Sequence, residues 1–582
     1  MSLGTGIATE YEKWLSTPME DPDLLEELQA VKGKEEEIND RFYQDLEFGT
    51  AGLRGVLGAG TNRMNIYTVR KATQGLSNYL LSHGVKTGVA IAYDSRIKSD
   101  LFAKESAAVL AANGIKAFVY PWLSPTPTLS FAVRYLKCDA GICITASHNP
   151  AKYNGYKAYG SDGCQITSEM AEGVQNEINS LDIFKDVKVI PFEEGCEKGL
   201  ISYIDESVLD AFLDEVYKER ILDEPCKGLK VVYTPLNGTG LVGVTRILKR
   251  IGVEDVTVVP EQEKPDGNFT TCPFPNPEIR EALKVGLELC EKVEPDLLLA
   301  TDPDCDRCGI AVKQKGEYVL MTGNEVGVLL LDFIARSRQE QGKLPKDPIA
   351  VTTIVSTDMA DAVAKAYGIR CVRVLTGFKY IGDQIALLEE RGEEDRFLLG
   401  FEESYGYLSG GYVRDKDAVD ASMLICQMAW YYKQKGMTLV DAMEALYETY
   451  GYYKNAVDNF GFEGEDGMIT MGKIMDSLRA SAPKEIAGYT VTGWSDYRES
   501  VCREGGKETP IDLPKSNVLE YRLENGCKVI VRPSGTEPKI KVYYSAKGAS
   551  PAESEELVKK MAESARVLLG VLFHGNCIQL FC

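Results

Sequence analysis

Ser147 is a candidate nucleophile because it stands in a short polar segment that follows an apolar run. The segment is residues 145–150 (TASHNP), and residues 141–144 before it have the composition of a buried strand. Open α/β sheets bind ligands at the carboxyl ends of their strands, where this segment would lie. A serine beside His148 could attack an electrophile if a base accepts its proton. A turn held by local side-chain hydrogen bonds would use the same residue types, so the rest of the chain has to decide.

A second polar segment has the composition of a site for a hard cation. Asp302, Asp304 and Asp306 alternate directly after the apolar run 297–300. In an extended loop this spacing places three carboxylates on one side, where they repel one another unless a cation neutralises them. The glycine and distal glutamate of an EF-hand are missing, and three carboxylates leave positions for water or a phosphate oxygen, which favours Mg²⁺. The alternative is a solvated acidic loop.

Two further loops carry groups suited to a phosphorylated sugar. Glu402 and Ser404 follow the apolar run 397–399 and could hold sugar hydroxyls. Residues 532–538 (RPSGTEP) combine a guanidinium, hydroxyls and backbone N–H groups, which suits a phosphate. An acidic turn and a plain hairpin turn are the respective alternatives.

Two glycine-rich segments give only weak indications of nucleotide binding. Residues 48–55, which include Arg54, lack the GKS or GKT ending of a P-loop. Residues 238–243 (GTGLVG) follow a strand pattern, but Glu254 and Asp255 stand too early for the acid that binds ribose. We interpret this second segment as a tight strand–helix turn, with an NAD(P)-dependent oxidoreductase as the alternative from another functional class.

The elements that would position these loops follow one pattern three times. Apolar runs at 88–93, 230–234 and 349–354 are each followed by a helical pattern and then by a second apolar run that ends at one of the first three polar loops. Strands that alternate with helices indicate βαβ units. The last part of the chain differs, with strands at 529–531 and 540–544 and a helix at 553–569, and indicates a smaller α+β domain.

These patterns predict four domains, and the chain length indicates three or four. We expect residues 1–206 to carry the serine loop, 207–323 the acidic loop, 324–452 the sugar loop and 453–582 the phosphate loop. The first boundary precedes Ser207, which has the character of a helix N-cap.

Composition excludes several kinds of partner. The formal net charge of −22 argues against nucleic acid or an anionic membrane as the main partner. We expect no membrane span and no secretory signal. An odd number of cysteines, 15, without a small-domain framework favours a reducing compartment, so the expected location is cytoplasmic. Only three histidines are present, which excludes poly-histidine metal sites, and the single CxxC, at 305–308, lacks a second pair for zinc.

The four loops together, in this order, resemble the α-D-phosphohexomutase superfamily over nearly the whole chain. That family has a TASHNP-type serine loop, a DPDxDR metal loop, a GEES-type sugar loop and an RPSGTEP-type phosphate loop. The resemblance implies three related α/β domains with mixed sheets and a C-terminal α+β domain around one central cleft. The chain length and the form GFEESYG are similar to those of the longer bacterial phosphoglucomutase-type members.

The resemblance also implies a role for each matching residue. Ser147 would carry a phosphoryl group and, with Asp302, Asp304 and Asp306, complete a Mg²⁺ site. Arg307 would stabilise the metal loop or the moving phosphoryl group. The general base stays open among His148, Lys157, Arg54 and Lys379, the first three of which would line the catalytic site. The implied substrate-binding residues are Thr376, Gly377, Lys379, Glu402, Ser404, Arg532, Ser534, Gly535 and Thr536.

The implied activity is interconversion of glucose 1-phosphate and glucose 6-phosphate through a glucose 1,6-bisphosphate that also serves as activator. Tyr405 after the loop serine and Phe378 after Gly377 depart from the dual phosphomannomutase pattern. Phosphopentomutase and phosphomannomutase activity are the alternatives within the family, and a non-catalytic sugar-phosphate sensor is another. The expected partner is a small sugar phosphate, and no obligate protein partner is implied.

Overall fold

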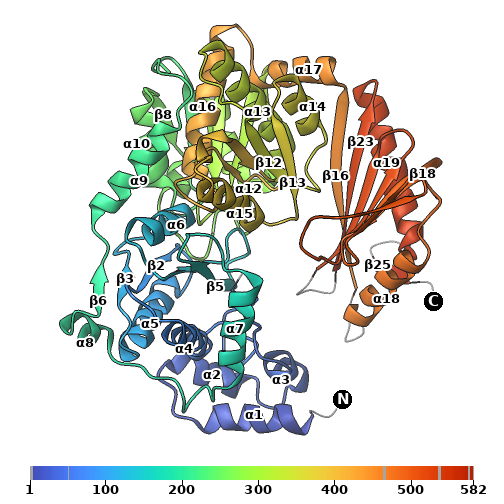
Figure 1. Ribbon diagram of the computed structural model, residues 1–582. Coiled ribbons are helices and arrows are strands. Elements are labelled where there is room, and N and C mark those ends of the chain that lie inside the picture. The colour runs from blue at the N-terminus through green and yellow to red at the C-terminus, as the bar shows by residue number, and fades with distance from the viewer. Residues whose placement is uncertain (1–3, 50–51, 463–466, 535–538, 575–576, 581–582) are drawn as a thin grey trace. The chain divides into compact units, whose positions relative to one another are not determined.

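A computed structural model describes residues 4–49, 52–462, 467–534, 539–574 and 577–580 (Figure 1). The chain forms two compact units. Unit 1 contains Met1–Gly323 and Ile381–Thr438, and unit 2 contains Asn324–Tyr380 and Leu439–Cys582. Both units contain helices and strands, which confirms the predicted α/β class.

Unit 1 begins with three helices that contribute to its first hydrophobic core. They are α1 (Thr5–Ser16), α2 (Pro22–Ala30) and α3 (Glu35–Phe42). Trp14 is fully buried between these helices and α4 (Ile66–Ser82), where its ring makes T-shaped, edge-to-face contacts with Phe42 and Tyr67. Because this burial removes large aromatic surfaces from water, the leading segment is part of the first core.

The first sheet carries the serine loop and has the strand order β1-β5-β4-β2-β3-β6. Strand β2 runs parallel to β3 and β4, whereas β5 turns back antiparallel to β4, so the sheet is mixed. Helices α5 and α6 pack on β2 from two sides (Figure 1). The strands are β1 (Leu53–Val56), β2 (Val89–Tyr93), β3 (Ala117–Val119), β4 (Ala140–Ile144), β5 (Tyr153–Gly160) and β6 (Ile201–Tyr203). The further helices are α5 (Ser99–Ala112), α6 (Thr126–Tyr135), α7 (Ser168–Asn179) and α8 (Phe192–Glu197).

The second sheet repeats this arrangement around the acidic loop. Its order, β11-β10-β9-β7-β8, has a parallel β7–β9 pair and an antiparallel β9–β10 pair, as β2, β4 and β5 have in the first sheet. The strands are β7 (Lys230–Thr234), β8 (Asp255–Val258), β9 (Leu297–Thr301), β10 (Cys308–Gln314) and β11 (Glu317–Met321). The helices are α9 (Glu206–Lys218), α10 (Leu241–Arg250), α11 (Pro260–Glu263) and α12 (Arg280–Val293). The N-cap expected at Ser207 is instead Asp205, whose side chain accepts the Ser207 N–H.

The third occurrence of the pattern contributes strands to both units. In unit 2, β12 (Ile349–Thr353) and β13 (Arg370–Val374) are parallel. In unit 1, β14 (Phe397–Phe401) and β15 (Tyr407–Leu408) are antiparallel about the sugar loop. The associated helices are α13 (Gly323–Glu340), α14 (Met359–Ala366), α15 (Phe378–Glu390), η1 (Glu394–Arg396), α16 (Ala418–Gln434) and α17 (Leu439–Tyr450). All six apolar runs of the predicted repeat are therefore strands.

The C-terminal part of unit 2 is an antiparallel sheet with helices. Its main path is β16-β23-β22-β21-β18-β19-β20, and β17 pairs with β18. Helices α18 and α19 cover one face, while Ile530 and Tyr543 on the other pack with Ile354 and Leu375. The elements are β16 (Tyr452–Gly461), α18 (Gly467–Ala480), β17 (Glu485–Ile486), β18 (Tyr489–Asp496), β19 (Val501–Glu504), β20 (Lys507–Pro510), β21 (Leu519–Leu523), β22 (Lys528–Pro533), β23 (Lys539–Gly548), α19 (Pro551–Leu568), β24 (Val571–His574) and β25 (Cys577–Leu580).

Two composition-based expectations can be compared with this fold. Across the ranges given above, none of the helices combines the length and apolar character that a bilayer crossing requires. Cys305 and Cys308 of the CxxC are both buried free thiols.

Candidate active site

The serine loop presents Ser147 at the carboxyl end of β4. The Ser147 N–H donates to Thr145 Oγ1 over 2.8 Å, and the Ser147 backbone adopts a left-handed φ of 51°. Its Oγ donates to Asp302 Oδ2 over 2.8 Å and lies 3.1 Å from His148 Nδ1. A buried serine hydroxyl is thereby directed at the acidic loop, which follows a strand of a different sheet.

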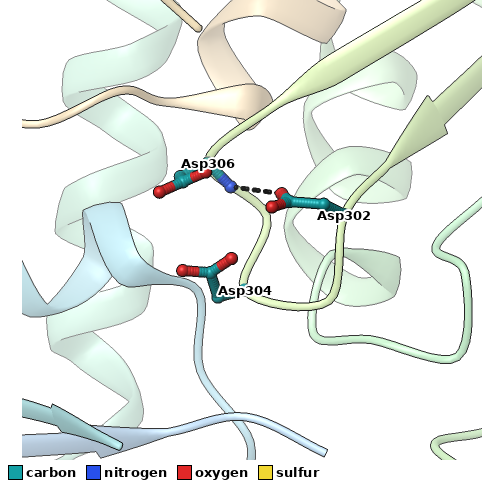
Figure 2. A group of neighbouring side chains, drawn as sticks. All are labelled: Asp302, Asp304 and Asp306. Carbon is teal, nitrogen blue, oxygen red and sulfur yellow. Dashed lines mark hydrogen bonds between the residues drawn. The ribbon is translucent and has the colours of Figure 1, made fainter. Parts of the chain in front are cut away.

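The acidic loop gathers its three carboxylates in a turn (Figure 2). Asp302, Asp304 and Asp306 are buried, and each offers one oxygen within 4.8 Å of the others. The expected extended conformation is wrong, because Cys305 has a φ of 54° and donates its N–H to Asp302 O over 2.9 Å. Asp302 Oδ1 accepts the Asp306 N–H at 3.0 Å, the dashed contact of Figure 2. The turn therefore brings the carboxylates together more tightly than alternation along a strand would.

Two buried lysines offset the charge of this cluster. Lys157 on β5 donates to Asp304 over 2.7 Å and to Asp306 over 3.2 Å. Lys416 lies 3.2 Å from Asp306 and donates to Asp415 over 3.0 Å. Burial acts to lower the pKa of Lys157, but Asp304 and Asp306 raise it well above its ordinary value. Both lysines are therefore cations at neutral pH.

The cluster also suits a divalent cation. Among the described residues, Asp304 Oδ1 and Asp306 Oδ1 are buried oxygens without a hydrogen-bond partner. Burial, reinforced by the charges of Asp304 and Asp306, raises the pKa of Asp302 well above its ordinary value. Unpartnered carboxylate oxygens beside a hydroxyl are ligands that a hard ion such as Mg²⁺ prefers, so the residues present fit such an ion.

His148 is the one imidazole near the serine in the part of the chain that the structure describes. Burial, followed by the charges of Arg307 and Arg54, lowers its pKa well below the ordinary value. The imidazole is therefore neutral near pH 7, and one of its ring nitrogens keeps a lone pair that can accept a proton. The geometry thus permits His148 as a base, whereas Lys157, which is a cation, would first have to lose a proton to act as one.

The comparisons with known proteins agree with this arrangement. Four domain descriptions of the phosphoglucomutase/phosphomannomutase family match the chain in order: alpha/beta/alpha domains I, II and III at residues 45–183, 210–316 and 322–450, and the C-terminal domain at 473–564. A phosphoglucomutase of Staphylococcus haemolyticus is 37% identical over 87% of this chain and 91% of its own length. One from Staphylococcus aureus is 38% identical over 88% and 91%.

The chain belongs to the phosphoglucomutase/phosphomannomutase family.

Solved structures of the family share the fold. A Thermus thermophilus protein named "putative phosphomannomutase" superposes with a TM-score of 0.65 at 22% identity. The superposition covers 90% of this chain and 99% of that one. The open form of parafusin, a phosphoglucomutase from Paramecium, gives 0.65 at 17% identity, with 90% and 95% covered. The four domain matches and the relatives at 37–38% identity confirm the resemblance to the α-D-phosphohexomutase superfamily.

The remaining family-implied residues of unit 1 lie around the cluster or on neighbouring loops. Arg54 on β1 is exposed and donates to Asn149 Oδ1 over 3.4 Å. Arg307 donates to Glu278 over 2.6 Å. Glu402 is buried directly after β14, and Ser404 is half-buried in the β14–β15 loop.

The family-implied residues of unit 2 lie on two of its loops. Thr376 and Gly377 precede α15, and Lys379 Nζ lies 4.9 Å from the centre of the Tyr380 ring. Arg532, the penultimate residue of β22, is opposite Lys541 of β23, and the Ser534 N–H donates to Lys539 O over 2.8 Å. Gly535 and Thr536 lie outside the described residues.

The glycine-rich segment 238–243 packs against the metal loop in this family member. The Thr239 N–H donates to Pro303 O over 2.9 Å, and a Cβ on Gly238 would lie 2.4 Å from Pro303 Cα. Since protein atoms take the place that a pyrophosphate would need, the segment is a close strand–helix turn. This finding argues against the oxidoreductase alternative.

Sequence reasoning missed several residues that hold the site. Thr126, at the start of α6, donates its hydroxyl to Asp304 Oδ2 over 2.8 Å, and its N–H donates to Asp304 O over 2.8 Å. Tyr159 donates to Asp415, the partner of Lys416. Arg96 and Lys416 were also missed, although their positions in the sequence could have indicated them. Arg96 stands just after the carboxyl end of β2, and Lys416 stands in a charged run just before the apolar helix α16.

Proposed function

We propose that this chain interconverts glucose 1-phosphate and glucose 6-phosphate, with Ser147 as the phosphoryl carrier. The observation that carries the proposal is the 2.8 Å contact between Ser147 Oγ and Asp302 within a buried cluster of three aspartates and two lysines. A hydrolytic serine would need a base and an oxyanion site, whereas this serine faces carboxylates that suit a cation. The curated relatives named phosphoglucomutase support the substrate class.

Each transfer exchanges one oxygen–phosphorus bond for another. Phospho-Ser147 gives its phosphoryl group to the free hydroxyl of a sugar monophosphate: the bond from Oγ to phosphorus breaks, and the bond from the sugar oxygen to phosphorus forms. The hydroxyl proton passes to a base, for which His148, Lys157, Arg54 and Lys379 are the candidates. After the bisphosphate reorients, the Ser147 oxygen bonds to the phosphorus of the other phosphoryl group, the bond from that phosphorus to its sugar oxygen breaks, and the sugar oxygen takes back the proton from the base.

The surrounding residues supply positioning and charge, which carry most of the catalysis in phosphoryl transfer. We assign Asp302, Asp304, Asp306 and Ser147 to hold Mg²⁺, which when bound offsets negative charge on the phosphoryl oxygens. Lys157 and Arg307 add positive charge beside the reacting group.

Substrate binding is assigned to three loops that the family resemblance implies. Glu402 and Ser404 accept and donate hydrogen bonds to sugar hydroxyls. Thr376, Gly377 and Lys379 orient the sugar, and Arg532 with Ser534, Gly535 and Thr536 holds the phosphate that does not react. Glucose 1,6-bisphosphate is the proposed activator, because it can phosphorylate Ser147. The four-domain division at 206/207, 323/324 and 452/453 and the cytoplasmic location stay predictions.

A comparison of substrates tests the proposal. The protein, loaded with Mg²⁺ and a trace of glucose 1,6-bisphosphate, is assayed for kcat/KM on glucose 1-phosphate, ribose 1-phosphate and mannose 1-phosphate. We expect the highest value for glucose 1-phosphate. A higher value for the pentose would favour a phosphopentomutase, and an absence of both turnover and phosphate at Ser147 would favour a sensor and overturn the proposal.

A further inference from the structure

Arg96 is a buried guanidinium whose hydrogen bonds go to the backbone of the serine loop. Its Nη1 donates to the carbonyl oxygens of Pro150 at 3.0 Å and Tyr153 at 3.1 Å. Its Nη2 donates to the carbonyl oxygens of Ser147 and Asn149. One side chain thus binds four carbonyls within residues 147–153, and the planar fork of arginine is suited to such a set of acceptors.

Asp94 restrains the peptide group on the N-terminal side of Ser147. One of its carboxylate oxygens accepts the backbone N–H of Arg96 at 3.0 Å, and the other accepts the Thr145 hydroxyl at 2.6 Å. Thr145 Oγ1 in turn accepts the Ser147 N–H at 2.8 Å. The N–H of Ser147 is therefore fixed through Thr145 and Asp94, and its carbonyl is fixed by Arg96.

This double restraint acts on a residue with an unfavourable backbone conformation. The φ of 51° at Ser147 places a non-glycine residue in the left-handed region, which persists only where the surroundings impose it. Rotation about this φ changes where Cβ and Oγ point. The bond from Oγ to Asp302 at 2.8 Å therefore depends on the restraint of the Ser147 peptide.

Arg96 also connects the serine loop to the second family domain. Its guanidinium carbon lies 5.0 Å from the centre of the Phe269 ring, which is fully buried. Phe269 lies within residues 210–316, the range of domain II, which also carries Asp302. The same guanidinium therefore contacts both the loop of the nucleophile and the domain of its acidic partner.

We infer that Arg96 is a positioning residue for phosphoryl transfer, which orients Ser147 Oγ toward Asp302 by holding the backbone of residues 147–153. This inference rests on the proposed function, because it assigns Arg96 a task in the reaction of Ser147. Arg96 bonds the loop carbonyls, so its effect on the chemistry is transmitted through the conformation of Ser147.

The experiment compares R96K with R70K. Arg70 is a matched control, since it is also buried and paired, with Glu20 and Glu105, but has no bond to the serine loop in the described contacts. For each variant we measure the phosphate on Ser147 after incubation with labelled glucose 1,6-bisphosphate and the single-turnover rate of its transfer to glucose 1-phosphate. We also measure kcat, KM and Tm. A lysine ammonium cannot serve four separate carbonyls, so we expect R96K to lower kcat and the transfer rate by about 10- to 100-fold, with KM within about twofold. R70K should lower Tm and leave kcat within about twofold.

A second variant keeps the inference testable if R96K does not fold. F269L removes the ring beneath Arg96 but leaves its hydrogen bonds in place, and should lower the transfer rate by about three- to tenfold. A transfer rate in R96K within twofold of the wild type, or, where R96K does not fold, an unchanged rate in F269L, overturns the inference. The inference is also overturned if R96K and R70K lose kcat in the same proportion to their loss of Tm. Failure of the wild-type protein itself to take phosphate on Ser147 and to turn over any sugar phosphate is the separate result that overturns the proposed function.

Discussion

The serine loop, which contains Ser147, and the acidic loop of Asp302, Asp304 and Asp306, called the metal loop below, lie on equivalent hairpins but are held by different interactions. Each follows a buried parallel strand, precedes an antiparallel one and contains a non-glycine residue in the left-handed region, Ser147 or Cys305. The carbonyls of the first loop bind a guanidinium, whereas the carboxylates of the second bind the two ammonium groups of Lys157 and Lys416.

In the serine loop the contacts fix the backbone conformation, whereas in the metal loop they offset the charge of the carboxylates. Carbonyl oxygens carry no net charge, so Arg96 fixes the conformation of the serine loop without neutralising it. The metal loop brings three carboxylates into a buried space, so its stability depends on cations, whether lysine or metal. Changes in the first loop should therefore alter the reaction rate, and changes around the second should alter stability in a metal-dependent way.

The largest effect is expected from Ser147→Ala. Without the oxygen that carries the phosphoryl group, kcat should fall by at least about 1000-fold while sugar-phosphate binding, measured by calorimetry, persists. Ser106→Ala is the control, because it removes a buried hydroxyl of α5 whose bonds, among the described residues, go to Phe102 O of the same helix and to Thr73. Turnover by S147A near the wild-type rate would remove Ser147 from the reaction.

The charge of the metal loop is tested with Lys157→Met. Loss of this cation leaves Asp304 and Asp306 less compensated in a buried site, which should cost about 3–5 kcal/mol of stability in EDTA. Saturating Mg²⁺ should restore more of the Tm in this variant than it adds to the wild type, because the ion replaces the missing charge. Lys71→Met, which breaks an ion pair with exposed Asp45, is the control and should show no such Mg²⁺ dependence. Equal Mg²⁺ shifts in K157M and wild type would contradict the distinction between the two loops.

The smallest effect concerns a carboxylate that is held by neutral groups. Asp417 accepts hydrogen bonds from Tyr412 and from the Val419 and Asp420 N–H groups, and burial raises its pKa to about 6. Its folded pKa is above the unfolded value of about 3.9, so the stability from this proton is fully present below about pH 4 and is lost as pH rises through about 6. The loss is about 3 kcal/mol.

Asp417→Asn should therefore be less sensitive to pH than the wild type. Unfolding is followed by Tm from about pH 4 to about pH 8, and the difference between the two proteins isolates this residue from the other titrating groups. We expect the variant to gain relative stability toward pH 8. A difference in Tm that does not change with pH would show that Asp417 does not titrate in this range.

The loops were predictable because their chemistry is local in the sequence. The apolar runs before Ser147, Asp302 and Glu402 are the strands β4, β9 and β14, and the residue types at their ends indicated the reacting groups. The partners that hold the loops could not be read from the sequence. Arg96 is 51 residues from Ser147, and Thr126 is 178 residues from Asp304, so only the fold brings them together.

The conformation of the metal loop shows a second limit. Alternating aspartates suggested an extended chain, but the left-handed Cys305 makes a turn. A single positive φ at a non-glycine residue has little local sequence signature, because the surrounding contacts impose it.

The hairpin β4–β5 sets a strict count on the residues of the serine loop. Cys143 of β4 is opposite Lys157 of β5, and successive residues of a strand point to opposite faces. If the loop keeps its conformation, insertion or deletion of one residue between these strands shifts the register of β5 by one, which would place Tyr156 or Ala158 where Lys157 lies beside the aspartates. Evolution can therefore vary the side chains of this segment more readily than its length, since an odd change in length would replace the cation of the metal loop with a side chain that carries no charge.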